Sequence, residues 1–435
     1  MAGNLVNIDS VNFRRVFPWI NLFRSFGIAI DPQKVLLAAF ALIAISGGNW
    51  MFANLPFAPD QADAQLWPWE RDLGYVESNH VSHQPIREVR VNDPFRTLVV
   101  VSTNWRVVLS PVMALINPGV VLLQTVSESN TEGTKTWADV AYAWTQLLWI
   151  LCVWAVFGGA ITRMVAVQFA RDEKVGLLAA LKFSVQRFLS YLLAPLLPIA
   201  GIGFFWLLCV LGGWIGRIPA IGEVLIGLFW IVPLFCGLFM ALMLVGVAAG
   251  WPLMYATISA EASDGFDGLS RAYCYVYGRP WHYLWMVIVA MAFGSVVIFF
   301  AWLVTWLLVY LGGWSVASGM GLNNAVALFQ ASAGLFGIDV LGGGTDEEYF
   351  LGSVAVGAWM RLVGLVLVGF IYSYFWSAFT IMYFLLRRSD DGTEFDQVYI
   401  TEDEQRNELL PLVGVAESDQ STDEAAVTSD SPSTE

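Results

Sequence analysis

The chain has 435 residues, of which 57% are hydrophobic and 13% are charged. An ordinary soluble domain has roughly 25% charged residues, so this composition excludes the usual water-soluble folds. The net charge of −14 belongs almost entirely to the C-terminal end, because residues 389–435 carry 14 acidic residues and one basic residue. No basic patch is present, which argues against nucleic acid as a partner.

The N-terminal segment, residues 1–34, carries apolar residues at helical spacing among several arginines. These apolar residues are Val16, Trp19, Ile20, Phe23 and Phe26. The pattern predicts an amphipathic helix that lies on the cytoplasmic surface of a membrane.

Six apolar stretches follow. A helix that crosses the roughly 30 Å hydrocarbon core needs about 20 mainly apolar residues, and six stretches meet this requirement. They cover residues 35–55, 140–162, 190–211, 224–249, 284–311 and 362–386. The sequence therefore predicts an all-α integral membrane protein, a six-span helical bundle over residues 35–388. Its outer loops are expected at about 56–136 and 312–350, and residues 389–435 are expected to form a disordered, acidic cytoplasmic tail.

The distribution of Lys and Arg predicts the orientation. With the N-terminus inside, fourteen of these residues fall in the inner segments and seven in the outer ones. We therefore expect a multi-pass protein of the cytoplasmic (inner) membrane with both termini in the cytoplasm.

Residues 98–123 form one further apolar stretch, whose assignment is ambiguous. Arg106 lies near its middle, and a charge at the bilayer centre costs at least about 2.5 kcal/mol. Pro111 and Pro118 also interrupt it. We expect an interfacial or re-entrant element on the outer face, with a seventh span as the alternative.

The sequence contains an internal similarity between two helical hairpins. A shift of 88 positions aligns Glu173 with Glu261, and Leu-Gly-Gly-Trp occurs at both 211–214 and 311–314. Because both hairpins would run in the same direction, the pattern predicts a parallel internal repeat. Chance similarity between apolar helices is the alternative. A weaker similarity relates the Ser-Asp segments that follow the fourth and sixth spans.

The turns that follow the second and fourth predicted spans contain the candidate sites for cytoplasmic interactions. The candidate residues are Glu173, Glu261, Asp264, Asp267 and Arg271. The acidic residues after the fourth span could form a docking or cation site. Helix capping by Ser263 or Asp264 is the favoured interpretation, because the spacing matches no calcium loop.

Small residues four positions apart in the fourth span predict close helix packing. They are Gly237, Ala241, Gly246 and Gly250. This spacing lets two helix backbones approach closely, either inside the bundle, which we favour, or between two copies of the chain.

The residues between the fourth and fifth predicted spans resemble a group of bacterial membrane families. Glu261, Gly265 and the Gly-Leu-Ser-Arg at 268–271 are similar to the membrane-anchor domain attached to some glycerophosphodiester phosphodiesterases. Those families place an acidic residue, a Gly and an Ala-Leu pair before a basic-Ser pair, whereas this chain has Gly268 for the Ala and Ser-Arg for the last pair. The resemblance covers about residues 140–310. It implies an anchor or a lipid-facing bundle, without the phosphodiesterase catalytic domain.

Candidate catalytic or ligand-binding residues are scarce in this sequence. The spans contain essentially no ionisable residue, and Arg163 at an inner edge is expected to reach water by snorkelling. Glu77, His80 and His83 share an outer loop, but its irregular character argues against a metal site. The four cysteines indicate no disulfide framework. No catalytic residue, metal site or cofactor is predicted.

The predicted function is therefore a non-catalytic membrane anchor, scaffold or assembly protein. Its partners would be membrane lipids and other membrane or cytoplasmic proteins. The alternative is a permease or lipid-handling protein with a pathway between the repeated hairpins.

Overall fold

The computed structural model describes residues 17–56, 58, 67–68, 105–123, 136–219, 221–321 and 350–400. This part of the chain is mostly helical and contains no strand. Six of its helices are long and apolar enough to cross a membrane. They are α3 (Pro32–Phe52), α7 (Trp137–Arg171), α9 (Phe188–Ile215), α11 (Ile231–Glu261), α13 (Pro280–Met320) and α15 (Phe350–Asp391). The chain is thus a multi-pass α-helical membrane protein, as predicted.

Shorter helices connect or flank these six. They are η2 (Pro18–Phe23), α2 (Arg24–Ala29), α5 (Trp105–Val108), α6 (Ser110–Leu123), α8 (Leu177–Gln186), α10 (Ile221–Leu228) and α12 (Gly265–Gly278). The ambiguous stretch corresponds to α5 and α6, which pack beside the long helices α13 and α7 respectively. The 14 residues of α6 extend about 21 Å at 1.5 Å per residue, which is less than the hydrocarbon thickness.

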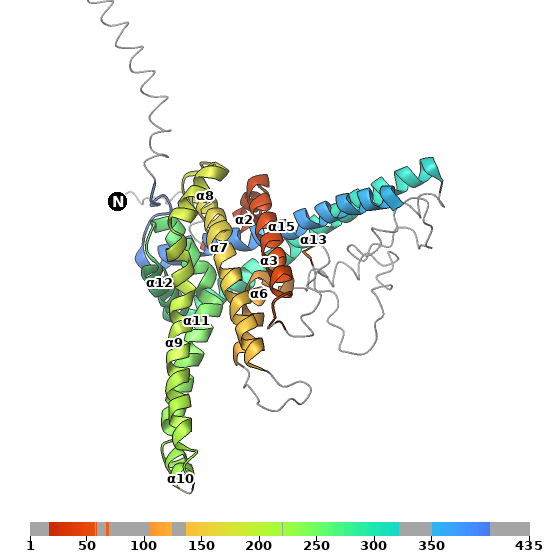
Figure 1. Cartoon of the computed structure of the whole chain (residues 1–435). Coiled ribbons are helices and arrows are strands. Elements are labelled where there is room, and N and C mark those ends of the chain that lie inside the picture. Colours follow the sequence, from red (N-terminus) through yellow and green to blue (C-terminus); the bar gives the residue numbers. More distant parts are fainter. Residues whose placement is uncertain are drawn as a thin grey trace, which may run out of the picture.

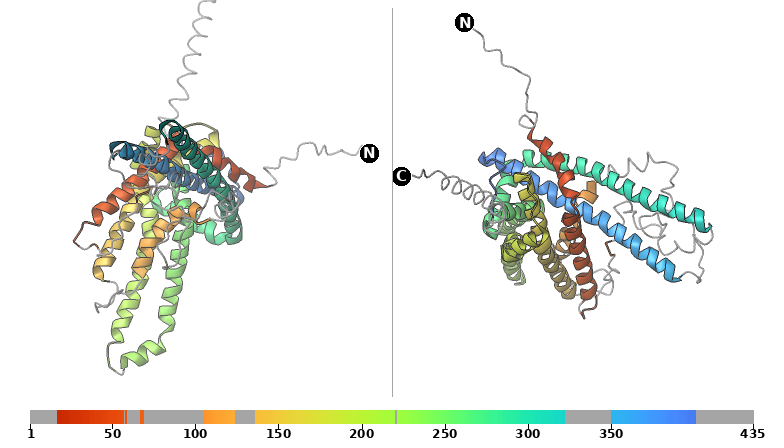
Figure 2. Two further views of the ribbon diagram at one scale, coloured as in Figure 1. Left: turned by 90° about the vertical axis from the view of Figure 1, so that its right-hand side faces the viewer. Right: turned by 90° about the horizontal axis from the view of Figure 1, so that it is seen from above.

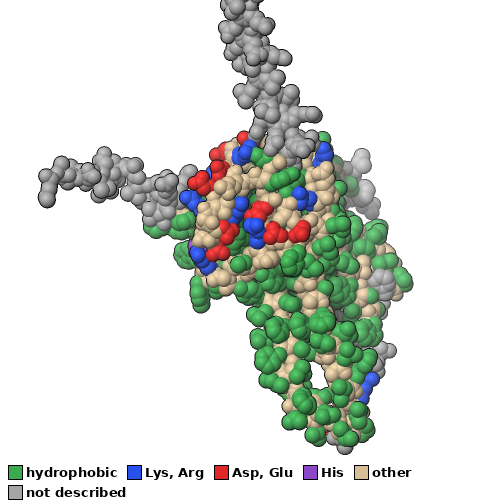
Figure 3. All heavy atoms as spheres, turned by 90° about the vertical axis from the view of Figure 1, so that its left-hand side faces the viewer, with side chains coloured by type: hydrophobic (Ala, Val, Ile, Leu, Met, Phe, Trp, Pro, Cys, Tyr) green, Lys and Arg blue, Asp and Glu red, His purple; other side chains and the backbone are tan. Residues whose placement is uncertain are grey.

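The long helices fan out from one end of the molecule. Helices α3, α7, α9 and α11 run roughly side by side, whereas α13 and α15 lie beside each other and leave the bundle crosswise (Figures 1 and 2). Lys, Arg, Asp and Glu gather where α8 and α12 lie (Figure 3). We call this region the charged end; it comprises the last turns of α7, α11 and α15 together with α8 and α12.

Capping residues define where α3 and α7 start. Thr136 and Asp139 form a reciprocal capping box at the start of α7, in which the Asp139 carboxylate accepts the Thr136 amide at 2.7 Å. The Asp31 carboxylate accepts a hydrogen bond from the Gln33 amide at 3.2 Å, and Pro32 lies in the first turn of α3. Both arrangements satisfy amides that have no partner inside the helix.

The core lies where α7, α11 and α15 cross. In the most apolar stretch of α7, 83% of the residues are buried, against 17% in α9 and in α11. The ring of Trp376 in α15 lies 5.4 Å from Trp154, 5.2 Å from Trp251 and 5.1 Å from Tyr255, measured between centroids. All four side chains are fully buried. We call them the aromatic core.

The N-terminal segment is more deeply integrated than the sequence predicts. Leu22 and Ile28 are buried, and the Ser373 hydroxyl of α15 donates to the carbonyl of Ala29 at 2.8 Å. One face of η2 and α2 therefore packs against α13 and α15. Phe23 and Phe26, from the predicted apolar face, are 43% and 41% exposed, and their rings contact Phe293 and Phe370. Residues 1–16 lie outside the described part of the chain.

Only half of the predicted packing motif in α11 packs within the chain. A Cβ atom at Gly246 would collide with the Tyr273 ring of α12, and one at Gly250 would lie 3.5 Å from the Cβ of Ala272. In contrast, Ala241 is exposed, and a Cβ at Gly237 would meet nothing within 4 Å. The internal packing expected at Gly237 and Ala241 is therefore not observed, because this half of α11 extends beyond the core.

Five of the six long helices extend past their predicted C-terminal ends, whereas α3 ends at Phe52 and α11 begins only at Ile231. Helix α13 continues past Trp314 to Met320, so the predicted outer loop at 312–350 begins later, and residues 322–349 lie outside the described chain. Helices α13 and α15 have 41 and 42 residues, and at 1.5 Å per residue each extends about 60 Å. Such lengths exceed the thickness of a bilayer core when a helix is not strongly tilted.

Candidate functional site

Three long helices end together at the charged end, and each is followed by a residue with positive φ. These residues are Asp172 after α7 (58°), Ala262 after α11 (54°) and Gly392 after α15 (70°). A left-handed residue stops a helix and redirects the chain. The three segments that follow are α8, α12 and residues 393–400, and they lie over the ends of the bundle.

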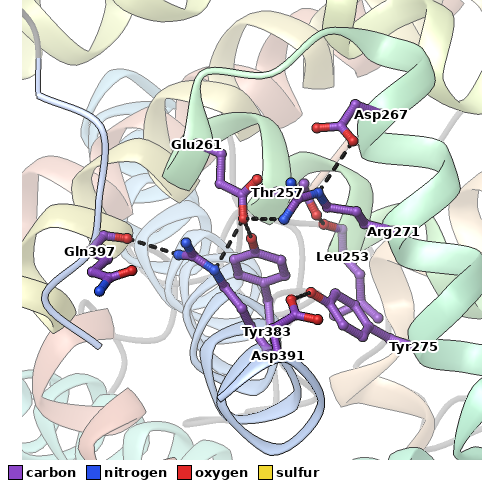
Figure 4. Close-up of polar contacts among 10 residues, drawn as sticks. Leu253, Thr257, Glu261, Asp267, Arg271, Tyr275, Tyr383, Asp391 and Gln397 are labelled. Carbon is purple, nitrogen blue, oxygen red and sulfur yellow. Dashed lines mark hydrogen bonds and ion pairs between the residues drawn. The ribbon is translucent and has the colours of Figure 1, made fainter. Parts of the chain in front are cut away.

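Glu261, the last residue of α11, holds three of these elements together (Figure 4). Its Oε1 accepts hydrogen bonds from Arg271 Nη1 of α12 at 2.8 Å and from the Tyr383 hydroxyl of α15 at 2.6 Å. Arg387 Nε of α15 lies 3.1 Å from the same oxygen. Glu261 and Arg387 are only 13% and 12% exposed, so this ion pair is largely shielded from water. We call these four residues the Glu261 node.

Further polar contacts connect α12 to the last turn of α15. The Tyr275 hydroxyl donates to Asp391 at 3.0 Å, and Arg279 Nε lies 3.2 Å from Asp390. Burial, together with the nearby Asp391 carboxylate, raises the pKa of Tyr275 above its ordinary value. Tyr275 therefore remains protonated and donates this hydrogen bond throughout the physiological pH range.

The last carbonyl groups of α11 are capped by other elements. Arg163 Nη1 donates to the Ser259 carbonyl at 2.9 Å, and Arg187 donates to the Ala262 carbonyl. The Tyr399 amide donates to the Ala260 carbonyl at 2.8 Å. Carbonyls at a helix end have no partner within the helix, and cations there are stabilising. The end of α11 is thus held by α7, by Arg187 beside α9, and by the segment after α15.

The prediction that Arg163 reaches water is wrong. Arg163 is fully buried, and its guanidinium lies over the Phe183 ring at 4.5 Å. The physical reason is that α7 continues to Arg171, which places Arg163 inside the helix and facing α8 and α11.

A buried hydroxyl cluster lies beside this arginine. The Ser259 hydroxyl lies 2.5 Å from that of Thr162 and 2.7 Å from that of Tyr191. The Ser184 hydroxyl of α8 donates to the Ala155 carbonyl at 2.7 Å. Sequence reasoning missed this cluster, because single hydroxyl residues in apolar helices give no spacing signal.

Residues 392–400, which we call the strap, pack back over the charged end. Phe395 contacts Phe169 of α7 with ring centroids 5.4 Å apart, and the Arg388 guanidinium lies over Phe395 at 4.5 Å. Arg387 Nη1 donates to the Gln397 carbonyl at 2.8 Å. The prediction of a disordered tail is wrong for residues 389–400, since the acidic average hides a few apolar residues that pack. Residues 401–435 lie outside the described chain.

Two truncations test the strap. Ending the chain after residue 391 removes the Phe395 and Tyr399 contacts, so we expect faster tryptic cleavage at Arg387 and Arg388 in membranes. Ending it after residue 400 keeps these contacts, and cleavage at both sites should match the full chain. Limited proteolysis with mass spectrometry measures both rates. Equal cleavage in the two truncated chains would contradict a structural role for the strap.

The structure brings together three of the five predicted interaction residues. Glu261 and Arg271 belong to the Glu261 node, and Asp267 lies 3.2 Å from Arg271. Asp264 accepts the Asp267 amide at 2.8 Å and caps α12, which confirms the capping interpretation. Glu173 is exposed and makes none of these contacts. Tyr383 and Arg387 were missed, because they come from a helix distant in sequence.

The described residues contain no group of three His, Cys, Asp or Glu side chains that could hold a metal ion. The loop residues considered as ligands, Glu77, His80 and His83, lie outside the described chain.

The fold and the charged end define a polytopic α-helical membrane protein whose long helices are tied together at one end by ion pairs. No protein-family model, curated protein or solved structure matches this chain. The resemblance to the membrane-anchor domain of glycerophosphodiester phosphodiesterases therefore stays a prediction.

Proposed function

We propose that this chain is a non-catalytic scaffold or anchor of the cytoplasmic membrane, and that it presents its charged end to protein partners in the cytoplasm. The observation that carries the proposal is the Glu261 node. Together with the strap it ties α7, α11, α12 and α15 into one unit. A surface built on such a unit has a defined shape that a partner can recognise with little loss of conformational entropy.

The charged residues at the same end of the molecule support the proposed orientation. Most of the Lys and Arg residues in the predicted inner segments lie at or near the charged end. They include Arg163, Arg187, Arg271 and Arg387. Excess Lys and Arg favour the cytoplasmic side. The described chain also both begins and ends near this region (Figure 2). We therefore place both termini in the cytoplasm, with α10 on the outer side.

The aromatic core argues against a pathway between α7, α11 and α15. Trp154, Trp251 and Trp376 fill this crossing and are fully buried, whereas a permease needs a route lined by polar groups or broken helices. The rival lipid-handling function draws on a different feature, the apolar α9–α11 hairpin, which stands away from the core. An ordinary lipid-facing surface accounts for the same feature.

We also propose that the two hairpins are copies of one unit. In both α7–α8–α9 and α11–α12–α13, a long helix stops at a left-handed residue and is followed by a short and then a long helix. The units differ in that α9 stays beside α7, while α13 diverges from α11 (Figure 1). This difference places the outer ends of α9 and α13 far apart.

Purification with native lipids, followed by mass spectrometry of the bound proteins and lipids, tests the scaffold function. We expect a stoichiometric protein partner that is lost in Glu173→Lys, where an exposed carboxylate of the charged end is reversed. Glu223→Lys is the matched control, since Glu223 is an exposed carboxylate in α10, and this variant should keep the partner. A stoichiometric bound lipid without a protein partner would overturn the proposal, and equal loss in both variants would contradict the assignment of this face.

A further inference from the structure

The hairpin formed by α9, α10 and α11 has a regular antiparallel register between its two long helices. Phe205 of α9 stacks on Phe239 of α11, with ring centroids 5.3 Å apart and an interplanar angle of 13°. One turn earlier in α9, a Cβ atom on Gly201 would lie 2.8 Å from the Met243 sulfur. Residues four apart in α9 therefore face successive turns of α11 in reverse order.

The next step of this register pairs two cysteines. Cys209 lies one turn after Phe205, and Cys236 lies three residues before Phe239. The register set by Phe205–Phe239 and Gly201–Met243 therefore places the two cysteines at facing positions across the hairpin. Cys152 belongs to α7 and Cys274 to α12, so the other two cysteines are on different helices. None of the four forms a disulfide in this structure.

The surroundings of this pair are apolar and face outward. The hairpin exposes large side chains around Cys209 and Cys236, including Trp206, Leu208 and Phe235. It projects as a green, apolar arm away from the charged end (Figure 3). Cys209 is partly exposed whereas Cys236 is buried, so lipid-soluble compounds can approach Cys209 from the bilayer.

We propose that Cys209 and Cys236 form an oxidisable thiol pair that closes a disulfide across the α9–α11 hairpin, with a hydroperoxide dissolved in the bilayer as the oxidant. The Cys209 sulfur attacks the terminal oxygen of the O–O bond while its proton passes to the leaving oxygen, which gives a sulfenic acid and releases the lipid alcohol. The second thiol then displaces water and forms the S–S bond. In sum, two thiols and one hydroperoxide yield one disulfide, one alcohol and one water. Proximity favours the second step, because the partner thiol is already in place.

Closure of this bond would join the two helices in a region where most of their large apolar side chains are exposed. Residues 209–236 would form a covalent loop that includes the tip of the hairpin. Both helices are lipid-facing in this region, so they are held mainly by contacts with each other. Oxidation is therefore expected to stiffen the arm without changing the Glu261 node.

The sequence offers a direct readout. Arg217 is the one Lys or Arg between Arg187 and Arg271, so trypsin separates the two cysteines into peptides 188–217 and 218–271. Membranes that contain the full chain are treated with cumene hydroperoxide, alkylated with N-ethylmaleimide, digested without reductant and analysed by mass spectrometry. We expect most of both peptides to appear joined, with two hydrogen atoms fewer than the sum, and to separate after reduction.

Controls keep this experiment decisive. Cys209→Ser should abolish the joined species, and Cys152 and Cys274 should remain alkylated in the same sample. Failure of both cumene hydroperoxide and the thiol oxidant diamide to join the peptides would overturn the pairing itself. Joining by diamide but not by the hydroperoxide would overturn the assigned oxidant and with it the proposed redox site.

Discussion

Glu261→Gln is expected to lower the free energy of unfolding by about 3 kcal/mol, which is the low end of the range for removing one partner of a buried ion pair. Gln can still accept a hydrogen bond from Tyr383, but the positive charges of Arg271 and Arg387 lose their common counter-ion. Arg387 is 12% exposed and cannot regain full hydration. Arg271 is 38% exposed, so water compensates part of its loss. Denaturant unfolding in mixed micelles, followed by circular dichroism, measures the change.

The chain supplies a matched control for this variant. Glu173 also follows a long helix at the charged end, and the sequence aligns it with Glu261, but it is exposed and lies outside the node. Glu173→Gln should change the free energy of unfolding by no more than about 0.5 kcal/mol, as surface substitutions usually do. A similar loss of stability in both variants would contradict the prediction that the contacts of the Glu261 node make Glu261 important.

Trp376→Ala is expected to cost about 3 kcal/mol, because it empties the centre of the aromatic core. Large-to-small core substitutions of aromatic residues cost about 3–5 kcal/mol in soluble proteins. In a membrane the transfer part is smaller, since lipid is as apolar as the core, and lost packing between the helices dominates. Trp154, Trp251 and Tyr255 all lose a ring contact with Trp376.

Trp281→Ala provides the comparison, because Trp281 is 82% exposed at the start of α13. Its unfolding free energy should stay within about 0.5 kcal/mol of the wild type. Thermal unfolding of both variants in the same detergent would rank them. A Trp376→Ala variant as stable as Trp281→Ala would show that the crossing of α7, α11 and α15 is not close-packed.

The charged end and the apolar arms have different physical roles. At the charged end, ion pairs, capped carbonyls and the strap fix the positions of the helix ends relative to one another. Apolar packing alone would not fix them. In the arms, apolar side chains face outward on nearly every side, so lipid replaces protein contacts there. This division places shape-defining contacts at one end of the molecule and lipid contacts at the other.

Composition and local sequence patterns were enough to predict the helical membrane class, the number of long apolar helices and the capping role at α12. These features depend on composition, on length relative to the bilayer and on local hydrogen bonds, all of which are encoded in contiguous residues. The sequence also located the turn at Glu261 as a candidate site. The lengths of α7 and α13 were underestimated. Helix α7 continues because Arg163 is bonded to α11, and the serines at the end of α13 donate to carbonyl groups of their own helix.

Which polar groups contact one another could not be predicted from the sequence, because it depends on how distant helices cross. Tyr383 lies 122 positions from Glu261, and its contact with the carboxylate depends on how α15 crosses α11. The burial of Arg163, the return of the strap and the crosswise exit of α13 depend on the same crossings. Crossing angles and helix rotation are set by the fit of small and large side chains between helices that are not adjacent in sequence. For that reason Glu261 could be chosen from the sequence, but its partners on α15 could not.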